Sequence, residues 1–203
     1  MREEKKNDKI TAIYKAVQEL LETGVDVRTM RVADVAVKAG IGKGTTYEYF
    51  SSKEEMIVKS MAYASHNMVV RIIAQMEKVS SFQDKFMILL NEMEEKIKQR
   101  VCLLKFLNMI SENGIYQELY NELLNDAEVR KSHPMRIITY LVERGMEEGI
   151  FSQKYPKEYI EISIFSRMIA FLMYVDAGYV ENKCSINEIK ENMYNGICRE
   201  FCD

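Results

Sequence analysis

The stretch AGIGKGTTYEYF, residues 39–50, places three glycines, one lysine and two threonines before three aromatic residues. Glycine adopts positive φ without strain, so Gly40 and Gly42 allow a sharp turn around Ile41, which is expected to pack inward. Residues 32–39 before the turn and 43–50 after it are predicted to be short helices. A short helix, a glycine turn and a second short helix form a helix-turn-helix.

A phosphate-binding loop is the other interpretation of these glycines. Such a loop follows a strand, whereas no strand pattern precedes residue 39. The spacing also matches neither the Walker pattern nor the dinucleotide-binding fingerprint. The context therefore favours the helix-turn-helix.

The second short helix is expected to enter the major groove of DNA by its N-terminal end, where free amides carry partial positive charge. Gly44 lets the backbone approach DNA closely, and Lys43 supplies charge near a phosphate or a guanine edge. The hydroxyl and methyl groups of Thr45 are both able to read bases. Tyr47 and Tyr49 are expected to reach the DNA backbone or a thymine methyl.

The composition predicts an all-α protein. The chain has 203 residues, which is one large domain or two small ones, and 47% of them are hydrophobic. Glycine and proline are rare, at nine and two, and helix formers are abundant. The net charge is −3, but residues 28–53 hold five basic and two acidic residues. Contact with nucleic acid is therefore expected to be local to this segment.

Helical periodicity extends along the whole chain. Ser52 and Glu55 are predicted to form a capping box. In it the Ser52 side chain accepts from the Glu55 amide, and the Glu55 side chain accepts in return from the Ser52 amide. The helix over 154–180 is apolar on most sides, so it must be buried on two sides. The predicted helices are 9–22, 32–39, 43–50, a fourth that starts at the capping box and ends before 79–81, 82–111, 115–124, one opening at 133–134 and ending at 149, 154–180 and 186–201.

Several other classes find no support. The four cysteines form no C-x-x-C pair, so a disulfide framework or a zinc site is not expected, and Cys198 and Cys202 are interpreted as inert thiols rather than redox sensors. No nucleophile–base pair, metal-ligand spacing or cofactor motif indicates an enzyme. No signal peptide or apolar membrane span is recognised, so a cytoplasmic protein without cofactor or metal is expected.

The segment RVADVAVKAGIGKGTTYEYFSSKEEM, residues 31–56, resembles the TetR family of bacterial transcription factors. The turn, the recognition helix and the cap of the next helix have the same spacing along the sequence as in that family. The resemblance implies an all-α fold with two parts. Residues 1–52 are expected to be a three-helix DNA-binding domain, and residues 53–203 a helical ligand-binding and dimerisation domain.

The resemblance also assigns residues to the DNA interface. The family usually has Ser or Thr where Arg31 stands; Arg31 cannot cap the helix but is able to hold a phosphate, and Thr29 is the alternative cap. The family prefers an aliphatic residue at Thr46, whose methyl group is able to pack. Arg28 and Lys38 are interpreted as part of a solvated face. The predicted DNA contacts are Arg31, Lys43, Gly44, Thr45, Thr46, Tyr47, Tyr49 and Lys53.

The resemblance further implies an effector pocket in the later helices. Methionine and aromatic side chains suit varied apolar ligands, although core packing is the simpler interpretation of any single one. The predicted pocket residues are Phe86, Met93, Phe106, Met109, Tyr116, Tyr120, Met168, Phe171 and Tyr174.

The expected function is a ligand-responsive repressor that binds a palindromic operator on double-stranded DNA. The last two helices are expected to pair with their copies in a homodimer. A small apolar or amphipathic effector is expected to release the DNA. The alternative is a DNA-organising or division-control protein on the same fold without an inducer.

Overall fold

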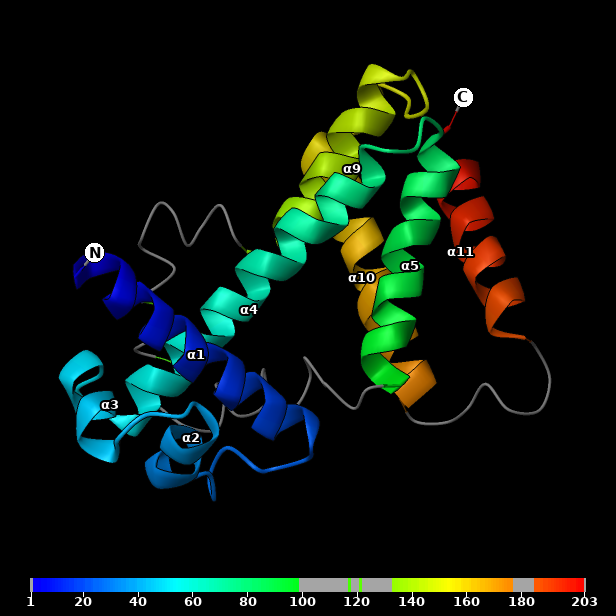
Figure 1. The fold of residues 1–203 in the computed structure, drawn as a ribbon. Helices are drawn as coiled ribbons and strands as arrows, with labels where there is room; N and C mark the ends of the chain where they lie inside the picture. Colours follow the sequence, from blue (N-terminus) through cyan, green and yellow to red (C-terminus); the bar gives the residue numbers. More distant parts are fainter. Residues whose placement is uncertain (1, 99–116, 118–120, 122–132, 177–184, 203) are drawn as a thin grey trace. The chain divides into compact units, whose positions relative to one another are not determined.

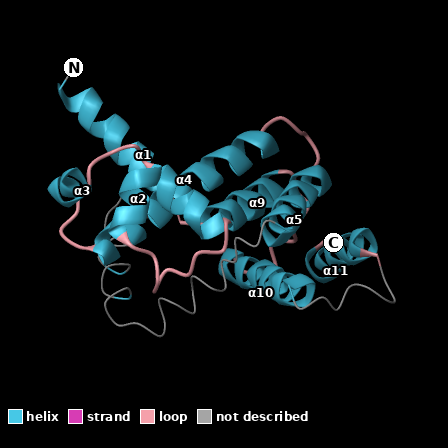
Figure 2. Cartoon of the chain, turned by 60° about the horizontal axis from the view of Figure 1, so that its bottom comes forward, coloured by secondary structure: helices cyan, strands magenta, loops and turns pink. Residues whose placement is uncertain are grey.

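The computed structural model describes residues 2–98, 117, 121, 133–176 and 185–202. These residues form helices and loops and no strand, which confirms the all-α prediction (Figures 1 and 2). None of the described helices combines the length and hydropathy that a bilayer span requires. The helices are α1 Arg2–Glu22, α2 Val32–Lys38, α3 Lys43–Tyr49, α4 Lys53–Met76, α5 Phe82–Lys98, α9 Met135–Glu147, α10 Lys157–Asp176 and α11 Ile186–Phe201.

The described helices fall into two compact units, which divide within α4 between Asn67 and Met68. The first unit holds α1, α2, α3 and the start of α4. The second unit holds the rest of α4 with α5, α9, α10 and α11. The domain boundary predicted at residues 52–53 coincides with the start of α4 and not with this division. The assignment of a function to each domain stays a prediction.

One apolar cluster holds the first unit together. Ile13 and Val17 of α1, Val35 of α2, Phe50 after α3 and Ile57 of α4 belong to it, and each is at most 3% exposed. Helices as short as α2 and α3, seven residues each, are not stable alone in water. Their stability therefore comes from burying one face in this shared cluster.

The turn between α2 and α3 depends on one glycine in the left-handed conformation. Gly40 has φ 68°, whereas Gly42 has an ordinary φ of −71°. The Gly40 amide donates to Val37 O (3.1 Å) and the Ile41 amide to Ala36 O (3.0 Å), the pair of bonds that closes a Schellman motif. Ile41 packs against the apolar cluster, as predicted. The turn thus fixes the direction in which α3 leaves α2.

Predicted helix bounds are confirmed most closely where glycine or a cap marks them. α1 begins at Arg2 rather than residue 9. The prediction missed its first turns because they are polar and show no apolar periodicity. α10 begins at Lys157 rather than residue 154, because the ring of Pro156 disfavours helical backbone at the residue before it. The helix predicted over 82–111 is described up to Lys98. The rest of it, and the predicted helix 115–124 except residues 117 and 121, lie outside the described residues.

The second unit has its own core, in which α5 contacts α9, α10 and α11. Figure 1 shows α5, α10 and α11 grouped within this unit. The ring of Phe82 meets the ring of Phe151 edge-on, with centroids 4.9 Å apart, a favourable geometry for aromatic pairs. The opposite face of α10 is not covered by the described chain. Its exposed apolar residues are Ile162, Phe165, Met173 and Tyr174, each 41–64% exposed.

Candidate nucleic-acid interface

Helix α3 presents its N-terminal end to solvent. Gly42 is the N-cap residue and has no side chain, so it makes no cap hydrogen bond to the turn's free amides. The first turn contains no acidic residue, so the partial positive charge of those amides is not offset locally. Lys43 and Gly44 are exposed, and the space that a Cβ on Gly44 would occupy is open to 4 Å. This end of α3 can therefore approach an anionic surface closely.

The side chains of α3 divide into an outer and an inner set. Tyr47 is 51% exposed. Thr45 and Tyr49 are half-buried, and the Tyr49 ring packs against the apolar cluster of the first unit. Phe50 directly after α3 is 3% exposed, and its ring centroid lies 5.9 Å from that of Tyr14 on α1. Phe50 anchors the helix so that Lys43 and Tyr47 remain on its outer side.

Thr46 belongs to the inner set, contrary to the prediction that it contacts DNA. It is 1% exposed, and among the described residues its hydroxyl has no hydrogen-bond partner. Its side chain takes the inward position where the resemblance had indicated an aliphatic residue. We therefore withdraw Thr46 from the predicted contacts.

Arg31 is the residue before α2, and its side chain forms no cap hydrogen bond. A guanidinium has no acceptor for the first amides of a helix. Arg31 donates instead to both carboxylate oxygens of Asp34, at 2.8 and 2.9 Å, and 78% of its side chain is exposed. This hydrogen bond is the main cause that raises the pKa of Arg31 and lowers that of Asp34. The alternative cap, Thr29, is wrong, because the Thr29 hydroxyl donates to Asp26 O at 3.1 Å.

A basic hollow of about 430 Å³ opens beside α3. Arg28, Arg31, Lys43 and Lys53 line it together with Tyr47, and its other lining residues are neutral. The ammonium of Lys53 donates to Arg28 O at 2.9 Å, which ties the start of α4 to the loop before α2. Four basic residues from three segments thus converge here, and none of the described lining residues is acidic. We call this site the basic hollow.

Arg28 is the residue of this site that the sequence did not indicate. It precedes the matched motif, and only the fold brings it beside Lys43 and Lys53. The excess of basic residues over 28–53 was the one available signal, and it does not distinguish Arg28 from Lys38. The structure does distinguish them, because Lys38 forms an ion pair with Glu19 (2.9 Å) and does not line the hollow.

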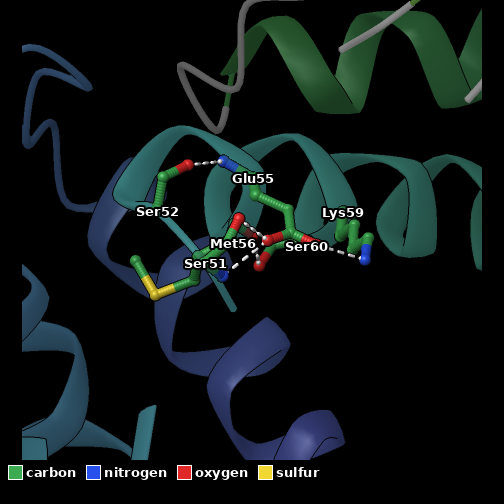
Figure 3. A network of polar contacts seen from close by, with 6 residues as sticks. All are labelled: Ser51, Ser52, Glu55, Met56, Lys59 and Ser60. Atoms are coloured by element: carbon green, nitrogen blue, oxygen red, sulfur yellow. Dashed lines mark hydrogen bonds and ion pairs between the residues drawn. The ribbon is translucent and has the colours of Figure 1, made fainter. Parts of the chain in front are cut away.

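Polar contacts of Ser51, Ser52, Glu55 and Lys59 fix the start of α4 (Figure 3). Ser52 Oγ accepts from the Glu55 amide at 3.0 Å, as predicted. The return bond differs from the prediction, because Glu55 Oε2 accepts from the amide and the hydroxyl of Ser51, both at 2.6 Å, rather than from Ser52. Lys59 donates to Glu55 Oε1 at 2.5 Å. The carboxylate thereby joins the end of the α3–α4 link to the second turn of α4.

The same contacts perturb the titration of Glu55 and its neighbours. The hydrogen bond from Lys59 and those from Ser51 lower the pKa of Glu55 to about 2. Burial raises the pKa of Tyr14, and the charge of Glu55 and the hydroxyl of Tyr63 add to this effect. The rings of Tyr14 and Tyr63 lie 5.0 Å apart, so α1 is held against α4 beside the charged cap.

The predicted effector residues lie in several different environments. Phe86, Met168 and Phe171 are buried in the core cluster of the second unit, and Met93 packs against that cluster. Tyr174 is 46% exposed on the uncovered face of α10. A hollow of about 480 Å³ in this unit is lined by other residues, from Met146 to Lys154. Outside the described residues lie Phe106, Met109, Tyr116 and Tyr120.

Within the described part of the chain, no three His, Cys, Asp or Glu side chains are grouped as metal ligands. Cys198 and Cys202 are half-buried near the end of α11 and are not joined in a disulfide. Burial and a hydrogen bond with Cys198 raise the pKa of Tyr194 to about 12.

Comparison with known proteins agrees with this geometry. Residues 13–59, which span α1 to the start of α4, match the family described as bacterial regulatory proteins, tetR family. This helix-turn-helix domain belongs to the TetR family. No curated protein matches the sequence.

Solved structures of other regulators share the fold along nearly the whole chain. The fatty acid degradation regulator FadR from Bacillus halodurans is 19% identical, with 94% of each chain covered and a TM-score of 0.68. FadR from Bacillus subtilis, solved with stearoyl-CoA, is 14% identical over 93% of this chain and 95% of that chain, with a TM-score of 0.65. A TetR regulator from Haloarcula marismortui is 13% identical over 97% and 100%, with a TM-score of 0.64. At these identities the likeness concerns the fold.

Proposed function

We propose that this TetR-type protein is a ligand-responsive repressor that binds a palindromic DNA operator as a homodimer. In this proposal residues 1–52 bind DNA, and residues 53–203 dimerise and bind the effector. The observation that carries it is the exposed N-terminal end of α3, with Lys43 and Tyr47, beside the basic hollow. A protein that binds duplex DNA needs a helix end that fits the major groove and basic side chains that contact the phosphates beside it.

The DNA-binding proposal is supported by the way charge is distributed. The whole chain carries a net charge of −3, so general attraction to nucleic acid is not expected. The basic hollow is a local exception, since four basic residues line it and its other lining residues in the described part of the chain are neutral. Phosphate contacts of this kind fix register. We propose that Thr45 reads base edges, and that Lys43 and Tyr47 contact either bases or the DNA backbone.

Substitution on the outer side of α3 tests this proposal. Lys43→Ala and Tyr47→Ala are each expected to abolish operator binding and to leave oligomeric state and melting temperature unchanged, because both side chains are exposed. The operator is first selected from random duplexes with the wild-type protein. Gel shift beside size-exclusion chromatography then measures both properties. Unchanged affinity in both variants contradicts the assignment of α3.

The homodimer is supported by the uncovered face of α10. Four large apolar residues there are 41–64% exposed, and apolar side chains gathered on one exposed helix face are typical of a protein contact. We propose that α10 and α11 pair with the same helices of a second copy. A two-fold dimer places its recognition helices on two half-sites of a palindrome, about 34 Å apart.

The effector is proposed to be a small apolar or amphipathic molecule that binds in the second domain. The core there is rich in aromatic and methionine side chains, and the similarly folded FadR from Bacillus subtilis was solved with stearoyl-CoA. We propose that the effector favours a conformation that does not bind DNA, and it acts only through its difference in affinity for the two conformations. Thermal shift with acyl-CoAs of increasing chain length tests this. A ligand that raises the melting temperature must also release DNA.

A further inference from the structure

We propose that the basic hollow binds one phosphate group of the DNA backbone, and that Arg28 is one of its ligands. No motif assigns Arg28 to the interface. The inference rests on the proposed DNA-binding function and adds a residue and a subsite to it. The hollow belongs entirely to the first unit.

The first support is the convergence of charge from three segments. Arg28 and Arg31 both come from the loop before α2. Lys43 and Lys53 are the first residues of α3 and α4. Arg31 also pairs with Asp34. An anion in the hollow would meet cationic groups from all three segments, and their attractions for it add together.

The second support is the geometry that places Arg28 there. The Arg28 amide donates to Asp26 Oδ1 at 2.7 Å, and Arg28 O accepts from Lys53 Nζ at 2.9 Å. Both backbone groups of Arg28 are therefore fixed, one by its own loop and one by α4. The guanidinium starts from a fixed point beside the Lys53 ammonium. Guanidinium binds phosphate through a planar fork of donors, whereas ammonium acts as a point charge.

The third support is the position of the hollow next to α3. Tyr47 lines it, and the Tyr47 hydroxyl is a donor that phosphate oxygens accept. Lys43 belongs both to the hollow and to the exposed end of α3. A helix end that enters the major groove brings its flanking residues to the phosphates along the groove edge. One phosphate in the hollow therefore contacts the residues that flank the recognition helix.

The salt dependence of DNA binding tests this directly. Each phosphate contact contributes about −0.9 to the slope of log K against log salt concentration for duplex DNA. We compare wild type, Arg28→Gln and the matched control Lys38→Gln, using a fluorescent mixed-sequence duplex of about 30 base pairs, since phosphate contacts are independent of sequence. Both variants lose one positive charge. Lys38 is paired with Glu19 outside the hollow.

Arg28→Gln is expected to reduce the magnitude of the slope by about 0.9 per protomer bound, while Lys38→Gln keeps the wild-type slope. Equal melting temperatures show that both variants are folded. An unchanged slope for Arg28→Gln, or an equal reduction in both variants, overturns the inference while the proposed function stands. If wild type binds no duplex at low salt, the proposed function is itself wrong.

Inorganic phosphate has the same chemistry as the DNA backbone, so a second measurement separates the two. Melting temperatures without DNA are compared in phosphate and in chloride at equal ionic strength. Comparable melting temperatures for the wild type in the two salts, with a reduced slope for Arg28→Gln, support a DNA phosphate. Stabilisation by phosphate that Arg28→Gln removes, with an unchanged slope, assigns the hollow to the free anion and overturns the proposal.

Discussion

Among single residues, Glu55 joins the link between α3 and α4 to the second turn of α4. Its carboxylate accepts hydrogen bonds from the Ser51 amide and hydroxyl and from Lys59 (Figure 3). These donors favour the ionised form and lower the pKa of Glu55 to about 2 from an ordinary value of 4.5. Ionised Glu55 therefore stabilises the folded state above about pH 4.5, and the stabilisation is lost as pH falls toward 2.

Glu55→Ala is expected to lower the free energy of unfolding at pH 7 by about 1 kcal/mol, a typical cost of losing a helix cap. The difference between variant and wild type shrinks as pH falls from 4.5 toward 2, because protonated Glu55 no longer contributes. Urea titrations between pH 3 and pH 7 measure it. Glu54→Ala is the control, expected to change stability by less than about 0.5 kcal/mol. A difference independent of pH contradicts the electrostatic explanation.

Within the helix-turn-helix element, two glycines serve different purposes. Gly40 has φ 68°, where a side chain is strained, although nothing crowds its Cβ position. Gly44 lies in α3 with ordinary helical φ and open space beside it. Glycine within a helix costs about 0.5–1 kcal/mol relative to alanine. No contact within the described chain requires Gly44, which supports a close approach of α3 to DNA.

Alanine at these two positions is expected to change stability in opposite directions. Gly40→Ala destabilises the protein by about 1–2 kcal/mol, because alanine resists the left-handed conformation. Gly44→Ala stabilises it by about 0.5–1 kcal/mol through helix propensity, yet weakens DNA binding because its methyl group enters the contact surface. Thermal melts and titration with the selected operator measure both. If Gly44→Ala binds DNA as tightly as wild type, the backbone at this position does not approach the duplex.

The same element shows how far the sequence predicts the site. Lys43 and Tyr47 follow from their offsets in the motif, since a helix directly after a turn exposes one face. Thr46 is adjacent, and its burial depends on which face of α3 packs against the rest of the first unit. Arg28 required the fold, because the contact between residues 28 and 53 crosses 25 positions of sequence. Spacing within one element is readable from sequence, whereas the meeting of separate segments is a property of tertiary packing.

At the scale of the whole molecule, the two proposed activities depend on one assembly. A palindromic operator is bound tightly only when two recognition helices are linked, because the second contact then becomes intramolecular. The exposed face of α10 is the surface proposed to supply that link. Its residue Ile162 is 64% exposed, and burying such side chains favours association by roughly 25 cal/mol per Å² of apolar surface.

Ile162→Glu is therefore expected to dissociate the dimer without unfolding the subunit. A charge buried in an apolar interface costs about 2 kcal/mol or more of association free energy, whereas the same residue is already solvated in the monomer. Light scattering after size exclusion measures mass, and operator affinity is expected to fall with it. Val70→Glu is the control, because Val70 is also exposed (55%) in the second unit but lies on α4. A dimeric Ile162→Glu variant contradicts the interface, and a monomeric one that keeps full operator affinity contradicts the link between dimerisation and DNA binding.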